Sequence, residues 1–397
     1  MTRRTLSNLR EDRCSTRGFS TRPAFAALLA VVGVLAGPCI ATAPAASGSS
    51  ATAVTTAARH TCALLSDRTV RCWGANDQGQ LGDGTRTRRL TAVAVRGLSN
   101  VIEVSGSSSY TCALVDDGGG SGPVECWGAW VGSQPKFRSL VPVAVKGVTD
   151  AIAVSAGIGI ACALLSDHTV ECWGDNSRGA FGNGTRDSSS SPVVVPELSN
   201  VQSVDAGEAH VCVVMQDRGT VRCWGWSGEL GPIEQAGDVL TPALVPRLTG
   251  ALSVDADVYH SCAVLIGGTP KCWSNFDTPK PRAEPGLNGV KTFAWAEDGQ
   301  QTVHSCALLP DGSVRCRSPY PLFGQLGNGT RKKNGNKLVT VSGLRDATAI
   351  SAADGYTCAV RSTGGVVCWG SNGDGVLGDG TTTMRSRPVV VKGLALR

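Results

Sequence analysis

Charged side chains are scarce in this sequence, and the excess of basic ones is confined to its start. Charged residues make up 17% of the 397, and the formal net charge is +5. Residues 1–24 contain six Arg against Glu11 and Asp12, residues 25–45 contain no charge, and the remainder holds 31 Lys and Arg against 30 Asp and Glu. A protein that binds nucleic acid concentrates Lys and Arg on the surface that faces the phosphates. The nearly neutral remainder therefore gives no support for a nucleic-acid partner.

The sequence also has little that could anchor it permanently in a membrane. Residues 25–37 form an apolar run of only 13 residues, which is short for a permanent span. Such a run after an Arg-rich stretch, followed by small residues at 41–46, is typical of a secretory signal and its cleavage site. We predict that residues 1–46 are an export leader that is cleaved, and that residues 47–397 form one secreted or cell-surface domain. The alternative is a leader that is uncleaved, or lipidated at Cys39, and retains the protein at the surface.

Helical periodicity and a collagen repeat are both missing. The 50 Gly residues show no every-third spacing, and no segment of ten or more residues combines a helical apolar pattern with end caps. Hydrophobic residues make up 42%, which is too many for a disordered chain. Short runs of β-branched and apolar residues, separated by Gly, Asp, Ser and Asn, instead predict an all-β protein.

What the sequence does contain is an internal repeat. The segment TCALLSDRTVRCWG at 61–74 returns as ACALLSDHTVECWG at 161–174, and five weaker copies bring the number to seven. Each repeat contains four short runs typical of strands, for example at 101–105, 112–115, 124–127 and 141–145. Four antiparallel strands cannot bury both of their faces alone, whereas seven such units arranged radially can. The prediction is a seven-bladed β-propeller of four-stranded antiparallel blades. The leading Cys residues of the copies are 50, 50, 50, 50, 44 and 52 residues apart.

The turn after the third predicted strand indicates a family. WGANDQGQLGDGT at 73–85 returns as GAFGNGT at 179–185, GQLGNGT at 324–330 and GVLGDGT at 375–381. Together with the period and the copy number, these turns resemble the regulator of chromosome condensation repeat, from residue 51 to the end of the sequence. The resemblance implies a seven-bladed propeller in which strands from both ends of the domain complete one blade. The export leader points to a secreted, bacterial-type member, whereas the best-known members are intracellular.

Several repeats depart from this pattern. Repeats two and five lack the GQLG-type turn, and repeat four keeps only Gly-Glu-Leu-Gly at 228–231. Repeat six has Arg317 where the other repeats have Trp. We expect the loops of these repeats to differ most from the family template.

Fourteen of the 16 Cys occur as one pair in each repeat, usually ten residues apart. In repeat six, residues 310–312 read as a three-residue hairpin turn that sets Cys306 opposite Cys316, within the separation that a disulfide tolerates. Buried free thiols are one alternative, and a metal site is another, although structural zinc sites usually have closely spaced Cys pairs or added His ligands. An exported protein meets conditions in which disulfides persist, so we predict seven disulfides within blades. The predicted pairs are Cys62 with Cys72, Cys112 with Cys126, Cys162 with Cys172, Cys212 with Cys223, Cys262 with Cys272, Cys306 with Cys316, and Cys358 with Cys368.

Few residues outside the repeat pattern could carry chemistry. The Gly-Asp-Gly-Thr stretches at 82–85 and 378–381 lack the Lys of a phosphate loop and the spaced acids of a calcium loop, so they read as turns. No catalytic carboxylate pair, Ser/His/Asp set or Cys nucleophile stands apart. We therefore expect no catalytic residue, no metal, no cofactor and no enzymatic activity. One quasi-ring, two residues before each leading Cys, reads either as ligands at the channel mouth or, preferably, as a repeated structural contact: His60, Tyr110, Ile160, His210, His260, His304 and Tyr356.

Two features remain as candidate contacts with a partner. Trp130 and Trp226 break the repeat and fall in irregular loops, unlike the Trp residues that recur at a strand position. Basic residues also follow the turns of repeats six, seven and one, which are neighbours in a closed ring, whereas Glu229, Glu234 and Asp238 occupy the matching region of repeat four. This basic arc is either an ordinary solvated rim or a surface for an anionic partner. Its residues are Arg86, Arg88, Arg89, Arg331, Lys332, Lys333, Lys337, Arg385 and Arg387.

The first functional hypothesis is a non-catalytic, monomeric extracellular propeller that binds a macromolecule through the loops of one face. The partner is then an anionic protein surface or a cell-wall polymer. The resemblance to the family supplies a second hypothesis, guanine-nucleotide exchange on a small GTPase, which is the activity of the family's eponym. A propeller-type enzyme inhibitor and a secreted carbohydrate-active enzyme are further alternatives, and the latter lacks a visible acid pair.

Overall fold

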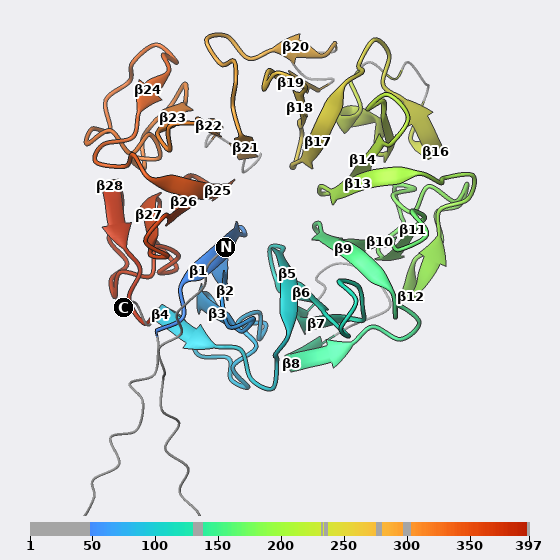
Figure 1. Ribbon diagram of the computed structural model, residues 1–397, viewed down its shortest axis with the longest axis horizontal. Helices are drawn as coiled ribbons and strands as arrows, with labels where there is room; N and C mark the ends of the chain where they lie inside the picture. Colours follow the sequence, from blue (N-terminus) through green and yellow to red (C-terminus); the bar gives the residue numbers. More distant parts are fainter. Residues whose placement is uncertain are drawn as a thin grey trace, which may run out of the picture. The chain divides into compact units, whose positions relative to one another are not determined.

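The computed structural model describes residues 48–129, 138–231, 233, 237–274, 280–296 and 303–394. These residues form seven antiparallel sheets, each built from four consecutive strands, arranged radially around a centre (Figure 1). The domain is therefore an all-β, seven-bladed β-propeller, as the repeat predicts. The predicted boundary between residues 46 and 47 lies outside the described residues and stays a prediction.

The strands of each blade follow the chain from the centre of the ring to its outer edge (Figure 1). Blades one to four contain β1 (Ala51–Thr56), β2 (His60–Leu65), β3 (Val70–Gly74), β4 (Arg89–Ala94), β5 (Val101–Gly106), β6 (Tyr110–Val115), β7 (Val124–Ala129), β8 (Arg138–Ala144), β9 (Ala151–Ala156), β10 (Ile160–Leu165), β11 (Val170–Gly174), β12 (Ser189–Val194), β13 (Val201–Ala206), β14 (His210–Met215), β15 (Val221–Gly225), the 3-10 turn η1 (Ser227–Glu229) and β16 (Val239–Leu244). Blades five to seven contain β17 (Ala251–Ala256), β18 (Ser261–Leu265), β19 (Pro270–Trp273), β20 (Arg282–Ala283), β21 (Thr292–Ala296), β22 (His304–Leu308), β23 (Val314–Arg317), β24 (Val339–Thr340), β25 (Ala347–Ala353), β26 (Tyr356–Arg361), β27 (Val366–Gly370) and β28 (Arg385–Val390).

Burial follows the position of a strand within its blade. The second strand is buried along its whole length in β2, because neighbouring blades cover its faces. The outermost strand is largely exposed, as in β12. The strands predicted at 101–105, 112–115, 124–127 and 141–145 correspond to β5 to β8, with ends that agree within three residues.

The predicted closure of the ring is wrong. Blade one consists of β1 to β4 and blade seven of β25 to β28, so neither blade combines strands from the two ends of the domain. The physical reason is where the repeats start and end relative to the blades. The first described strand, β1, is the innermost strand of blade one, and the last, β28, is the outermost strand of blade seven, so every blade is complete by itself. The ring is closed by contacts between complete blades instead.

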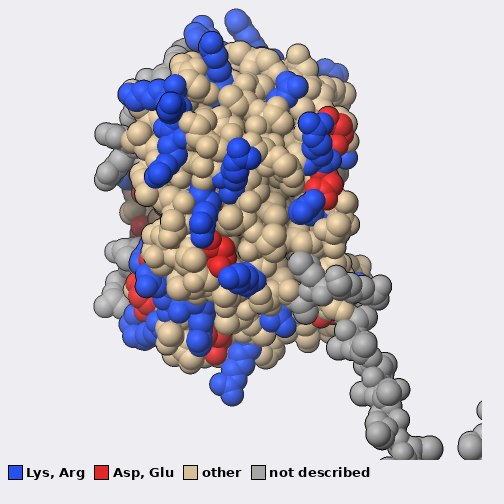
Figure 2. Space-filling view, turned by 90° about the vertical axis from the view of Figure 1, so that its left-hand side faces the viewer, with Lys and Arg blue, Asp and Glu red and all other residues tan. Residues whose placement is uncertain are grey.

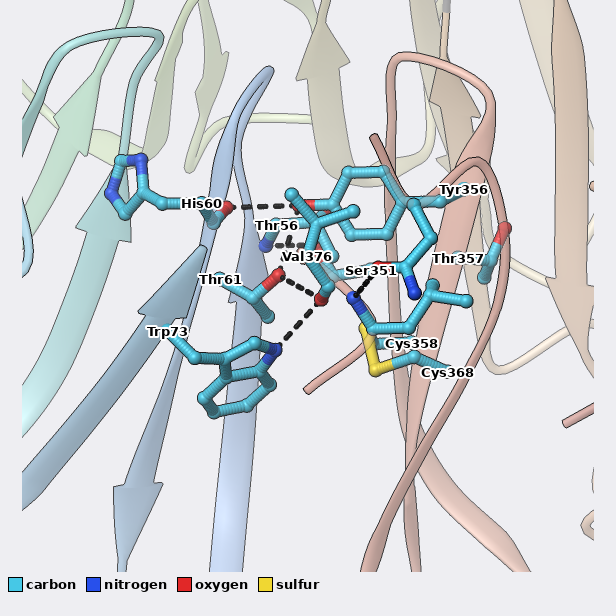
Figure 3. Close-up of a disulfide and its surroundings, with 12 residues drawn as sticks. Thr56, His60, Thr61, Trp73, Ser351, Tyr356, Thr357, Cys358, Cys368 and Val376 are labelled. Atoms are coloured by element: carbon cyan, nitrogen blue, oxygen red, sulfur yellow. Dashed lines mark hydrogen bonds between the residues drawn. A yellow bond between two sulfur atoms is a disulfide. The ribbon is translucent and has the colours of Figure 1, made fainter. Parts of the chain in front are cut away.

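These closing contacts join blades one and seven without a shared sheet. The amide of Ala51 donates to the carbonyl of Gly364 at 2.8 Å, and the amide of Ala92 donates to that of Lys392 at 2.9 Å. The hydroxyl of Tyr356 lies 2.8 Å from the carbonyl oxygen of Ala57 and 2.9 Å from that of His60 (Figure 3). An apolar cluster that includes Val54, Trp73, Val360, Leu377 and Leu394 fills the space between the two blades.

Proline protects most of the outer edges. An outermost strand exposes unpaired amides that could pair with another chain, and Pro removes one of them. In five blades, Pro immediately precedes the residue of the outermost strand that lies opposite the second Cys in the sheet. Blade one has Ala92 there instead, and its amide donates to Lys392, so the closure of the ring uses the hydrogen bond that Pro would prevent. The five prolines are Pro142, Pro192, Pro242, Pro281 and Pro388.

All seven predicted Cys pairs are disulfides in the structure. Each links the second and third strands of one blade, with Cα atoms 4.0–4.2 Å apart. The 14 sulfur-bearing residues are buried, because the hairpins lie between neighbouring blades. In blade two the disulfide spans 14 residues, and the extra residues extend the hairpin turn without moving Cys112 out of register with Cys126.

Four of the recurring Trp residues connect their blade to the preceding one through the GxLG turn. The indole nitrogen of Trp127 donates to the carbonyl of Gln80 at 2.9 Å, and that of Trp73 donates to Val376 at 2.7 Å. Trp224 and Trp369 make the same bond to Ala180 and Gln325. All four acceptors occupy the second position of a GxLG-type turn.

This contact explains two departures in the sequence. Blade two lacks the turn, and the indole nitrogen of Trp173 in the following blade has no hydrogen-bond partner among the described residues. Blade five also lacks the turn, and the following blade has Arg317 in place of Trp. The Arg317 guanidinium lies 2.5 Å from the carboxylate of Glu284 and 3.2 Å from the carbonyl oxygen of Pro285, both in blade five.

We expect Trp127→Phe to cost about 1 kcal/mol more free energy of unfolding than Trp173→Phe. Both changes remove a similar buried volume, but only Trp127 loses a hydrogen bond. Urea denaturation of the two variants under oxidising conditions measures the difference. Equal losses would show that the bond to the GxLG turn adds nothing to stability.

Candidate binding surface

The turns that carry the basic arc lie at one end of the propeller. The connection between the third and fourth strands starts beside the turn between the first and second strands, since the amide of Ala75 donates to Arg59 and that of Ser371 donates to Gly355. The side chain of Arg59 then pairs with Asp77 and Asp374, which belong to the third connections of blades one and seven. We call this end the loop face.

The Gly-Asp-Gly-Thr stretches are turns stabilised by their own side chains. Asp83 accepts hydrogen bonds from the amide and hydroxyl of Thr85 at 2.9 and 2.7 Å, and its second oxygen lies 2.7 Å from the Arg89 guanidinium. Although partial burial opposes it, the hydrogen bonds from Thr85 and Arg89 lower the pKa of Asp83. Asp379 and Arg385 repeat this pair in blade seven at 2.7 Å. Arg89 and Arg385 therefore serve their own turns.

The other seven residues of the basic arc are exposed on the loop face: Arg86, Arg88, Arg331, Lys332, Lys333, Lys337 and Arg387. Two of them show that the three blades form one surface. Arg88 of blade one lies 3.4 Å from the carbonyl oxygen of Gly373 in blade seven, and the Arg387 guanidinium lies over Gly329 of blade six. Lys and Arg outnumber Asp and Glu on the outer side of blades six and seven (Figure 2).

Charge is segregated between two halves of the ring. Residues 48–100 and 303–394, which form blades one and seven and most of blade six, contain 18 Lys and Arg against 8 Asp and Glu. Residues 101–302 contain 12 Lys and Arg against 22 Asp and Glu. The near-neutral composition of the domain therefore hides a basic half and an acidic half, which together create a long-range field.

The acids predicted opposite the basic arc are only partly described. Asp238 pairs with Arg186 of blade three. The predicted residue Glu234 lies outside the described residues, and nothing is described of the side chain of Glu229. Trp130, one of the two predicted aromatic contacts, also lies outside the described residues.

Trp226 is the described member of that predicted pair of aromatic contacts. It is half-buried rather than fully exposed. The Arg178 guanidinium lies 5.5 Å from the centre of its ring, and Tyr259 meets it edge-on with ring centres 6.2 Å apart. Trp226 thus belongs to a small cluster over blades three to five, away from the basic arc.

A polar cavity of about 240 Å³ opens at the centre of the loop face. Its wall carries a belt of side chains from the innermost strands, each of which accepts a hydrogen bond from an amide of the next blade. Ser105 accepts from Ala156 at 3.0 Å, for example, and Ser351 accepts from Thr56 at 3.0 Å across the closure of the ring. We define this belt as Thr55, Ser105, Ser155, Asp205, Asp255 and Ser351.

The two carboxylates of the belt were not singled out in the sequence. Asp205 accepts from Ala256 at 2.7 Å, and Asp255 accepts from Trp295 at 3.0 Å. Burial, and then the charge of Asp205, raises the pKa of Asp255 to about 7, and burial raises that of Asp205. Burial likewise raises the pKa of Glu103 to about 7. An alignment of the repeats contains this signal, because Asp205 and Asp255 stand where four other repeats have Thr55, Ser105, Ser155 or Ser351.

The quasi-ring before each leading Cys is structural where hydrogen bonds are described. His60 lies 2.7 Å from the Thr111 hydroxyl, and His304 lies 2.9 Å from that of Thr357, in each case in the next blade. Burial, reinforced by the charge of Arg59, lowers the pKa of His60 to about 3, so this side chain is neutral at physiological pH. Within the described residues, no group of three or more His, Cys, Asp and Glu is placed to hold a metal ion. The described part of the chain also has no helix long and apolar enough to cross a membrane.

Comparison with known proteins agrees with the repeat pattern. Two sequence models of the regulator of chromosome condensation (RCC1) repeat match this chain, one at residues 52–80, 151–180 and 201–229, the other at 69–114 and 167–214. Among solved structures, human WBSCR16 is similar with a TM-score of 0.67 and 19% identity, over 81% of this chain and 94% of that one.

Two further structures come from different settings. The entire ectodomain of the Physcomitrella patens receptor kinase CR4 has a TM-score of 0.52 and 20% identity, over 81% of this chain and 74% of that one. Prp20p of Saccharomyces cerevisiae, described with its binding to Gsp1p and histones, has a TM-score of 0.50 and 18% identity, over 86% and 76%. At these identities the likeness concerns the fold alone.

Proposed function

We propose that this chain, a seven-bladed β-propeller of RCC1 repeats, is a non-catalytic extracellular module that holds an anionic macromolecule against the loop face of blades six, seven and one. The observation that carries this proposal is the segregation of charge, with 18 basic against 8 acidic residues in that half. Seven of the nine arc residues are exposed. Such a surface attracts and orients an anionic partner.

The extracellular location is supported by the seven disulfides, because bonds of this kind persist in oxidising compartments. The likeness to the CR4 ectodomain shows that this fold also occurs outside cells. Nucleotide exchange on a small GTPase, the alternative suggested by the family, would place the domain in a reducing compartment. Disulfides do not persist in such a compartment. The non-catalytic role is supported by the cavity, whose carboxylates in the belt accept hydrogen bonds from backbone amides.

The experiment is affinity capture with the oxidised domain from the native culture medium or cell surface. The triple variant Arg88→Glu, Lys332→Glu and Arg387→Glu reverses three exposed charges and leaves the structural pairs of Arg89 and Arg385 intact. We expect it to bind the captured partner about tenfold more weakly at low salt, with the difference shrinking as salt screens the charges.

A matched control keeps the same change in net charge at exposed positions outside the arc. It carries Lys146→Glu, Arg218→Glu and Lys291→Glu. We expect this variant to bind like the wild type. Equal binding by all three proteins, or equal losses in both variants, would remove the basic arc from the mechanism.

A further inference from the structure

The loop after β23 in blade six departs from the other blades in chemistry as well as length. At the matching place blade one has Asn76, Asp77 and Gln78, and blades three and seven are also polar. Blade six has Pro-Tyr-Pro-Leu-Phe at 319–323. Tyr320 and Leu322 are each 46% exposed. Large apolar side chains therefore stand where blades one, three and seven present polar ones to solvent.

The backbone of this loop is held in place independently of those side chains. The amide of Tyr320 donates to the Ser318 hydroxyl at 3.2 Å, and its carbonyl accepts from Gln325 at 3.0 Å and from the amide of Leu322 at 2.8 Å. Two prolines further restrict the chain. The exposed side chains of Tyr320 and Leu322 are thus presented by a preorganised loop, which lowers the entropy cost of binding.

Basic residues and a third apolar side chain surround the loop. The Lys333 amine lies 4.7 Å from the centre of the Tyr320 ring. Gly324 packs against the backbone of Arg385, which follows Met384, a residue that is 42% exposed. We define the six–seven patch as Tyr320, Leu322, Met384, Arg331, Lys332, Lys333 and Arg387.

We propose that the six–seven patch docks an acidic polypeptide segment that also carries an apolar side chain. The basic residues fit its carboxylates, and Tyr320, Leu322 and Met384 fit the apolar side chain, whose burial contributes affinity that charge alone does not. An anionic polysaccharide has no aliphatic side chain to cover Leu322 and Met384. This inference rests on the proposed function and names the chemical class of its partner.

The test is a selection from a random peptide library displayed on phage, performed on the immobilised, oxidised domain. We expect enriched sequences to combine Asp or Glu with Leu, Phe, Ile or Met. Enriched sequences without acids or without apolar residues, or no enrichment at all, would overturn the proposal.

Binding of one enriched peptide to two variants then locates the site by fluorescence anisotropy. Tyr320→Ser with Leu322→Ser is expected to weaken binding about tenfold. The control, Leu252→Ser with Ile266→Ser, alters residues that are 51% and 73% exposed in blade five and is expected to leave binding unchanged. Equal binding by the two variants would overturn the proposal.

The charge-reversal variant separates this inference from the proposed function. If the captured native partner loses affinity on charge reversal but not in Tyr320→Ser with Leu322→Ser, the basic arc stands and the partner is an anionic polymer without an apolar anchor. That result overturns the inference and leaves the proposed function intact. If neither change weakens capture, both fail.

Discussion

Replacing Asp255 by Asn is expected to raise the free energy of unfolding at pH 8 by about 2 kcal/mol. Displacing a carboxyl pKa from near 4 to about 7 corresponds to about 4 kcal/mol, and we take about half because Asp255 borders the cavity, where water screens its charge. Asn keeps the acceptor for the amide of Trp295 and removes the charge beside Asp205. Burial of an ionised carboxylate is thereby avoided.

The sign of the pH dependence follows from the raised pKa. In the wild type the contribution of Asp255 is fully present below its unfolded pKa, near 4, and is lost as the pH rises through about 7. Urea denaturation at pH 5 and pH 8 should therefore show a larger fall for the wild type than for Asp255→Asn. A parallel fall in both proteins would contradict the prediction.

Replacing Tyr356 by Phe is expected to reduce the free energy of unfolding by about 2 kcal/mol. Its hydroxyl is fully buried, lies against the carbonyl oxygens of Ala57 and His60, and is 3.0 Å from the Thr61 hydroxyl. All of these partners belong to blade one, whereas Tyr356 belongs to blade seven (Figure 3). The change removes hydrogen bonds from a junction that no strand crosses.

Tyr110→Phe is the matched control, because Tyr110 makes the corresponding contacts with Gly157 and Ile160 between blades two and three. Those two blades are consecutive in the chain, so they stay tethered when the contact is lost. We expect similar global losses, but faster hydrogen exchange of the β1 amides only in Tyr356→Phe. Equal exchange of β1 in the two variants would show that the closing junction opens no more readily than the others.

The parts of the fold that were predicted correctly depend on interactions within one repeat. The Cys pairs lie ten to 14 residues apart across a hairpin, and the four strands of β5 to β8 lie within 44 residues. These contacts form between residues of the same repeat, so the sequence of one repeat is sufficient to predict them. The pair of Asp83 with Arg89 is equally local, six residues apart, and the sequence pattern contained it although Arg89 was assigned to the basic arc.

The predictions that failed or needed the structure depend on how one blade meets the next. Closure of the ring without strand exchange follows from where the repeat starts within a blade, and the family resemblance implied the opposite. Trp127 donates to Gln80, which lies 47 residues earlier in the chain. Asp205 accepts from Ala256, which lies 51 residues later. A separation of about one repeat does not show whether two residues are in contact, because equivalent residues of adjacent repeats have this separation in either case.

The sequence by itself determined the number of blades, the seven disulfides and the turns, because each arises from residues close together in the chain. Only the tertiary structure decided that blades one and seven close the ring as complete sheets, that two arginines of the basic arc serve their own turns, and that Asp205 and Asp255 share the belt around the cavity. The physical reason is that packing between blades sets the burial and pairing of these groups. Charge that is scarce and balanced along the chain becomes, once the ring closes, a basic half and an acidic half.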